Sequence, residues 1–220
     1  MRLNWYTSGM DVNIVYLLIV FVVIIISMTL HEAMHAYASF WLGDHTAKLQ
    51  GRLTLNPIKH IDPFLTILLP LALALSGAPV FGGAKPVPIN PFALRYGDWG
   101  MALVALAGPI TNFVLAFVFF GIWVLTGVSD QSLFGLIFST IVSVNLGFFV
   151  FNMIPIPPLD GSRVMYALAP DFIQRGMEAM ERYGIIVIFA ILLVGSQYVN
   201  VFMSTSISFF FDVFNNIFIH

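Results

Sequence analysis

Residues 12–30 of the chain form the stretch VNIVYLLIVFVVIIISMTL, which contains no charged side chain. A mostly apolar run of about 18 residues or more is typical of a helix that spans a membrane. The composition of the whole chain agrees, because 59% of its 220 residues are hydrophobic and only 9% are charged. Soluble domains carry about 25% charged residues. The sequence therefore predicts an integral membrane protein.

The composition also limits the partners and the processing of the chain. A net charge of -2 gives no reason to expect nucleic acid as a partner, and the absence of cysteine excludes disulfides and thiolate metal ligands. The first apolar run exceeds the roughly 7–15 residues of a signal peptide's apolar region, and only Arg2 is basic before it. We therefore expect the run to be retained in a single membrane domain over residues 1–220.

Five apolar segments predict four full spans and one shorter helix. They cover residues 12–42, 63–75, 101–126, 133–156 and 185–201. The second segment, of about 13 residues, suits a short re-entrant or interfacial helix, although a full crossing within residues 63–77 stays open. We predict an all-α polytopic membrane protein with a core at about residues 12–165 and an additional C-terminal span at about residues 185–204.

Two further segments lie outside these spans. Residues 81–88, FGGAKPVP, are rich in glycine and proline, and the prolines exclude a helix there, so an extended chain is expected. Residues 202–220 form a phenylalanine-rich tail. This tail either lies as a helix in the membrane interface or continues the last span.

The distribution of basic residues predicts the orientation in the membrane. If residues 63–75 do not cross fully, the connections 43–100 and 157–184 lie on one side and hold eight of the nine Lys and Arg residues. Basic loops mark the cytoplasmic side. We therefore expect a multi-pass protein of the cell membrane, the inner membrane in a bacterium, with its N-terminus outside and the first span ending inside.

The motif His31-Glu32-Ala33-Met34-His35 directly follows the first apolar run. On a helix the two histidines share a face and can bind one Zn2+, while Glu32 can reach a metal-bound water. The alternative is a structural polar cluster. Ionisable groups within a membrane cost about 2–3 kcal/mol or more each and usually serve a function, which favours the metal site. His31 lies about 28 Å along the helix from Val12, so the site would lie in the cytoplasmic half of the membrane.

A catalytic zinc takes a third protein ligand and keeps an open position. Asp160 is the candidate, because it follows a proline-rich break after a span that should also end on the cytoplasmic side. The two motifs can meet only if the spans that carry them run parallel. From the pattern alone, an ordinary Asp-Gly turn with Gly161 explains Asp160 equally well.

Asn112 follows Gly108-Pro109 within the third apolar segment. An amide within the membrane needs hydrogen-bond partners, so Asn112 could orient the substrate, orient a metal ligand, or join two helices, and the packing role is slightly favoured. His45 and His60 lie in a polar loop, where solvated histidines are expected.

Together these elements resemble a known family. The sequences His31-Glu32-x-x-His35, Gly108-Pro109-x-x-Asn112 and Asn152-x-x-Pro155-x-x-Pro158-Leu159-Asp160-Gly161 resemble those of the site-2 protease family. Residues 43–57 and 81–88 look like its small bacterial branch without PDZ-like or CBS-like domains.

The resemblance implies a zinc enzyme that cuts single-span membrane proteins within or near their transmembrane helices. It implies one Zn2+ per chain held by His31, His35 and Asp160, with Glu32 as the catalytic residue. Asn112, Asn152 and Lys85 are the candidates for positioning the substrate, and residues 81–90 could pair with its unwound strand.

Two rival functions stay open. A metal transporter would use the same ligands without Glu32, but such proteins usually show pseudo-symmetric broken helices, which the sequence lacks. A non-catalytic scaffold would keep a degenerate site, whereas all four catalytic groups are present here. The sequence leaves the oligomeric state unknown.

Overall fold

The computed structural model describes residues 14–69, 72 and 82–219. Four of its helices are long and apolar enough to cross a membrane, and the described residues contain no strand, which confirms the predicted all-α polytopic fold. These four helices are α1 (Ile14–Trp41), α4 (Gly97–Thr126), α5 (Leu133–Asn152) and α9 (Ser196–Phe218). The chain is therefore a multi-pass membrane protein.

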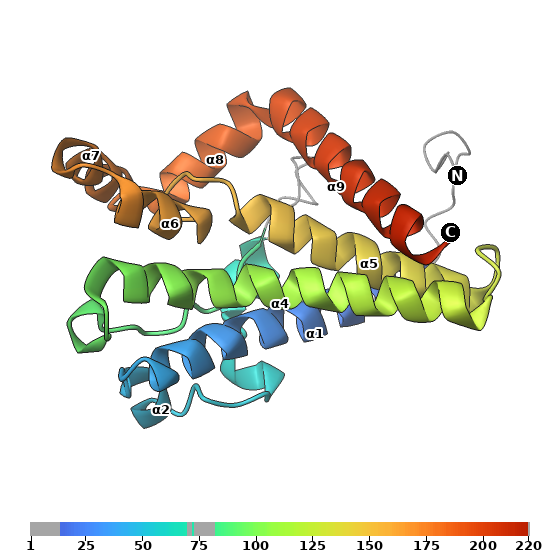
Figure 1. Ribbon diagram of the computed structural model, residues 1–220, viewed down its shortest axis with the longest axis horizontal. Coiled ribbons are helices and arrows are strands. Elements are labelled where there is room, and N and C mark those ends of the chain that lie inside the picture. The colour runs from blue at the N-terminus through green and yellow to red at the C-terminus, as the bar shows by residue number, and fades with distance from the viewer. Residues whose placement is uncertain (1–13, 70–71, 73–81, 220) are drawn as a thin grey trace.

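Helices α1, α4 and α5 form the bundle that carries the site. Figure 1 shows α1 and α5 running in the same direction, with α4 antiparallel to both. A tight turn joins α4 to α5. Gly127 takes φ 61°, in the left-handed region that favours glycine, and ends α4. The Ser132 side chain caps the start of α5 by accepting a hydrogen bond from the backbone N–H of Gly135. Since α1 and α5 run in the same direction, their C-terminal ends, which carry the two predicted metal motifs, lie at one end of the bundle.

The C-terminal region differs from the prediction. The expected span at about residues 185–204 is wrong, because the chain forms a short helix α8 (Gly184–Val194), breaks at Gly195 and then forms α9. The phenylalanine-rich tail is part of α9. Phe214 is 1% exposed and packs with Phe120 of α4 and Leu146 of α5, so aromatic packing holds the C-terminal half of α9 against the bundle.

The connection between α1 and α4 folds into short elements beside the end of α1. They are α2 (Thr46–Leu49), a 3-10 turn (Pro57–Lys59), a π-helical turn (Pro63–Leu68) and a second 3-10 turn (Pro91–Ala93). The predicted short helix at residues 63–75 lies partly outside the described residues. His60 is fully buried, with Nε2 2.8 Å from the Thr54 carbonyl, so the prediction of a solvated histidine is wrong there; His45 is exposed.

Residues 82–90 have no helical or strand pairing and are fixed by individual hydrogen bonds. Gly83 donates its N–H to Leu65 and accepts from the Thr66 hydroxyl, and Lys85 donates its N–H to the carbonyl of His60. The N–H of Asn90 donates to Asp44 at 2.7 Å. The prolines prevent a regular ladder, so side chains of the neighbouring loop hold this segment instead.

The polar connection after α5 forms α6 (Gly161–Leu168) and α7 (Asp171–Glu181). An ion pair between Arg163 and Glu181 and a hydrogen bond from the Tyr166 hydroxyl to Glu178 join the two helices. Asp160 directly precedes α6, and this helix contacts α4. This contact places the start of α6 against the bundle.

Candidate metal centre

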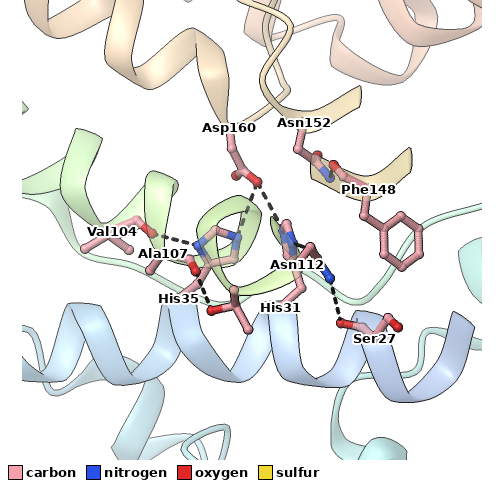
Figure 2. Close-up of polar contacts among 10 residues, drawn as sticks. Ser27, His31, His35, Val104, Ala107, Asn112, Phe148, Asn152 and Asp160 are labelled. Atoms are coloured by element: carbon pink, nitrogen blue, oxygen red, sulfur yellow. Dashed lines mark hydrogen bonds and ion pairs between the residues drawn. The ribbon is translucent and has the colours of Figure 1, made fainter. Parts of the chain in front are cut away.

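His31 and His35 lie one turn apart on α1 and turn their imidazoles towards α4 and Asp160 (Figure 2). The Oδ2 atom of Asp160 lies 3.1 Å from Nε2 of His31 and 3.4 Å from Nε2 of His35. The ligand atoms of the three residues all lie within 4.8 Å of one another. The structure thus brings together the three residues that were expected to hold the metal.

Hydrogen bonds on the far side of each imidazole define which nitrogen faces the centre. Nδ1 of His31 lies 2.5 Å from Oδ1 of Asn112, and Nδ1 of His35 lies 2.8 Å from the carbonyl of Val104. Both partners are acceptors, so in neutral imidazoles each Nδ1 carries the proton and each Nε2 presents a lone pair. This is the arrangement of metal-binding histidines whose other nitrogen is fixed by an outer partner.

The residues fit a bound zinc ion. With these tautomers, two Nε2 lone pairs and a carboxylate point at one another, and acceptors grouped in this way need a cation between them. Tetrahedral zinc, with bonds of about 2.0–2.2 Å to nitrogen and oxygen, separates its ligand atoms by about 3.3 Å. The 3.1 and 3.4 Å separations match this value. The side chains of both histidines are 8% exposed whereas that of Asp160 is 22% exposed, so Asp160 is the most exposed of the three candidate ligands.

Gly108 lets α4 approach the centre. A Cβ atom at this position would lie 2.5 Å from Nε2 of both His31 and His35. No side chain other than hydrogen fits there without moving an imidazole. The Gly108-Pro109 element of the sequence therefore has a steric role at the candidate metal centre.

Asn112 is fully buried and joins three helices. Besides its contact with His31, its Nδ2 donates to Oδ1 of Asn145 on α5 at 2.8 Å, and Nδ2 of Asn145 donates to the Ser27 hydroxyl on α1 at 2.9 Å. These bonds fix which amide atom faces His31. Asn112 thus contacts a candidate metal ligand and packs helices together, and its side-chain atoms are engaged within the protein.

Asn145 and Ser27 were not singled out from the sequence. The signal that would have found Asn145 is the same that marked Asn112: a lone amide within an apolar span needs a partner. Ser27 is one turn before His31 on α1, so it lies on the same helix face.

The other candidate residues lie around this centre. Glu32 is half-buried on α1 between the two histidines. Asn152, in the last turn of α5, donates from Nδ2 to the carbonyl of Phe148 at 3.0 Å and lies on the Asp160 side of the centre (Figure 2). Lys85 is exposed on the extended segment, and its backbone is held by neighbouring residues.

Arg52 is a further buried charge near the candidate site. It is 5% exposed, and its Nη2 donates to the carbonyl of Lys85 at 2.5 Å, while its Nε has no partner among the described residues. Burial lowers the pKa of Arg52, and the negative charge of Glu32 acts against this. Arg52 therefore connects the extended segment electrostatically to the motif on α1.

The chain combines a bundle of membrane-spanning helices with a His-Glu-x-x-His motif and a carboxylate whose distances to both histidines fit tetrahedral zinc. These features define the class of membrane-embedded zinc metalloproteases. Comparison with known proteins agrees. The Bacillus subtilis protein named "putative zinc metalloprotease YwhC" is 41% identical over 180 residues, which are 79% of this chain and 78% of YwhC.

Two mycobacterial proteins named Rip2 are more distant. The one from Mycolicibacterium smegmatis is 31% identical over 77% of this chain and 64% of its own length, and the one from Mycobacterium tuberculosis is 29% identical over 79% and 68%. No family model and no solved structure matches the chain. The extent of the similarity to YwhC shows that this chain belongs to the site-2 protease family of zinc metalloproteases.

Proposed function

We propose that this chain is an intramembrane protease that hydrolyses peptide bonds within or near the transmembrane helix of single-span membrane proteins. His31, His35 and Asp160 hold the zinc ion, and Glu32 is the catalytic residue. The observation that supports this most is the group of three ligand atoms together with the Glu32 carboxylate, which lies on the same turn of α1 as the two histidines and forms no hydrogen bond with any described residue. A transport site needs the ligands but not Glu32.

Bound zinc supplies Lewis acidity and activates a water for attack on the scissile carbonyl. The Glu32 carboxylate accepts a proton from the attacking water and donates it to the leaving amine nitrogen. Asn112 acts behind the centre, where its Oδ1 fixes the ring of His31. Asn152 acts on the Asp160 side of the centre, where its Oδ1, which has no hydrogen bond within the described chain, is available to a substrate N–H.

The extended segment supports a binding mode for the substrate. A helix must unwind before its carbonyls can be attacked, and the resulting strand can add to an exposed extended segment. The backbone groups of Gly83 and Lys85 are used within the protein, whereas the N–H and carbonyl of Ala84 form no hydrogen bond with any described residue. Pro86 and Pro88 offer only carbonyls, so the substrate strand must supply donors there. The exposed Lys85 side chain lies on the same segment.

The proposal includes the orientation of the chain in the membrane. The basic connections 43–100 and 157–184 lie in the cytoplasm, the N-terminus outside, and the candidate centre opens to the cytoplasmic side. A reporter enzyme fused after residue 170 tests this. Activity of an extracytoplasmic reporter at that position would contradict the orientation.

The activity is tested with the purified chain in liposomes and a panel of single-span substrates. We expect the wild type to cleave at least one substrate, Glu32→Gln to bind zinc without cleaving, and Glu178→Gln on α7 to cleave normally. Zinc flux into the liposomes without cleavage by any variant would instead indicate a transporter. Zinc binding with neither cleavage nor flux would indicate a scaffold.

A further inference from the structure

Helix α9 carries a continuous polar row on the face that points away from the bundle. Asn200, Ser204, Ser208, Asp212 and Asn216 follow one another at intervals of four residues, and all five are exposed. Residues four apart lie on one face of a helix, so the row extends over about 24 Å. We call these five residues the α9 polar row.

The opposite face of α9 fixes the depth of this row. Phe214 packs with Ala116 and Phe120 of α4 and with Val142 and Leu146 of α5, in the interior of both spans. Phe210 contacts Phe113 and Phe149 in the same way. Asp212 lies between these two phenylalanines in the sequence. Asp212 therefore lies beside the apolar middle of the bundle and not on a membrane surface, and the row extends from it along α9 in both directions.

Lipid cannot satisfy such a row. Within the described chain, the side chains of Asn200, Ser208, Asp212 and Asn216 form no hydrogen bond or ion pair, and Ser204 donates only to the carbonyl of Val201 in its own helix. A carboxylate facing lipid near the bilayer centre costs about 2.5–3.5 kcal/mol, and polar side chains there normally face protein or water. Such a row needs polar partners, and another helix beside α9 can supply them.

The chemistry of the row limits what this partner can be. It must lie within the membrane, run alongside α9, and offer donors and acceptors at the same spacing. The row itself meets this description, since hydroxyls and amides both donate and accept. A second copy of the chain, inserted in the same orientation, would bring identical residues to the same depth around a two-fold axis.

We propose that the α9 polar row is the interface between two copies of this protein in the membrane. Ser204 and Ser208 form a small-x-x-x-small pair that lets two helices approach closely. Rows of residues four apart pack at crossing angles of about 40–50°. With the crossing near Ser208, the two Asp212 carboxylates lie on opposite sides of the two-fold axis, and each can accept a hydrogen bond from the Ser208 hydroxyl of the other copy.

Cysteine crosslinking tests this directly, because the chain has no cysteine of its own. Full-length Ser204→Cys and Ser208→Cys are oxidised in native membranes and compared with Val118→Cys, on an exposed position of α4. We expect a product of twice the chain mass at positions 204 and 208 but not at 118. Adding Ser208→Leu to Ser204→Cys should lower the crosslinked fraction about threefold to tenfold, whereas adding Val118→Leu should leave it unchanged.

Zinc content and alkylation of the free cysteine show that each variant is folded and that the cysteine is reactive. Equal crosslinking at 118 would indicate random collision and overturn the proposal. No product at 204 or 208 from a reactive cysteine, or a product only with another protein, would overturn it as well. These readouts do not depend on proteolysis.

Discussion

Oδ1 of Asn112 lies 2.5 Å from Nδ1 of His31, on the side of the ring opposite Asp160. This contact fixes the orientation of one candidate ligand from a different helix. Partners of this kind typically change metal affinity by about 10–100-fold. We expect Asn112→Leu to weaken zinc binding by that amount, measured by competition with a chelator. Thr111→Val is the control, because the Thr111 hydroxyl donates only to Ala107 in its own helix. Unchanged affinity in Asn112→Leu would show that the ring needs no such partner.

Asn145 holds Asn112 in turn, although it does not touch the candidate centre. Asn145→Leu would remove the donor to the Ser27 hydroxyl and the 2.8 Å acceptor of Asn112 Nδ2, which would keep only the Ser27 carbonyl at 3.4 Å. An unsatisfied buried polar group costs about 1–3 kcal/mol, so we expect a loss of stability of that size in denaturant unfolding. If the two asparagines act through one network, the effects of Asn112→Leu and Asn145→Leu are not additive. Additive effects in the double variant would mean that they act separately.

The approach of α4 at Gly108 leads to a steric prediction. A methyl group there would lie 2.5 Å from both Nε2 atoms. Gly108→Ala should therefore prevent zinc binding or weaken it strongly, even though alanine favours a helix more than glycine does. Gly147→Ala on α5 is the matched control, because a Cβ there has no atom within 4 Å. Equal zinc stoichiometry in the two variants would contradict this prediction.

Much of this arrangement follows from the sequence. The long apolar runs and the His-Glu-x-x-His spacing are local patterns, and they suffice for the bundle and for the pair His31 and His35. The role of Asp160 as third ligand came from the family resemblance, because the pattern alone fits an Asp-Gly turn equally well. The boundary between α8 and α9 was not predictable, because residues 185–204 are as apolar as a span. The structure breaks the helix at Gly195, and it is the aromatic residues of the second helix that pack against α4 and α5.

Contacts that depend on how each helix is rotated about its axis also could not be predicted from the sequence pattern. Asn145 reaches Asn112 only because of the rotation of α5 about its axis. His60 and Arg52 are buried because the loop folds back over residues 82–90, so a polar composition gave the wrong environment for His60. Tertiary packing decides these cases.

The hydrogen bonds of the Asp44 carboxylate lead to a prediction of how the stability of the fold depends on pH. Asp44 lies in the loop that supports the extended segment. Burial would raise the pKa of Asp44, but hydrogen bonds from the Thr46 hydroxyl and from the N–H groups of Asn90 and Thr46 outweigh this and lower it. A lowered pKa in the folded state means that the ionised group stabilises the fold above its unfolded pKa of about 3.9, and that this contribution is lost as the pH falls through the folded value.

Asp44→Asn should therefore be less stable than the wild type at pH 7, and the difference should shrink as the pH falls below about 4. Thermal unfolding of both proteins over this pH range measures it. Asp130→Asn, in the turn between α4 and α5, controls for the change in net charge. A constant difference between wild type and Asp44→Asn at all pH values would show that ionisation of Asp44 does not contribute.

Arg52 provides the last prediction, for the extended segment. Its guanidinium holds the Lys85 carbonyl, while the Lys85 N–H is held by the carbonyl of His60. Arg52→Gln removes a charged hydrogen bond of about 1.5–3 kcal/mol and leaves that carbonyl without its partner, so the segment should lose its fixed position. Because the candidate metal ligands lie on other elements, zinc content should stay the same.

If residues 82–90 bind the substrate, the consequence of Arg52→Gln is a KM raised about tenfold with a smaller change in kcat, because a displaced segment weakens binding more than it affects the reacting groups. Arg52→Lys keeps the charge but not the fork of donors, and we expect an intermediate KM. Lys59→Gln, an exposed charge in the same loop, should behave as the wild type. A fall in kcat at unchanged KM would instead mean that Arg52 acts through Glu32, whose charge it faces. It would contradict a role of the extended segment in substrate binding.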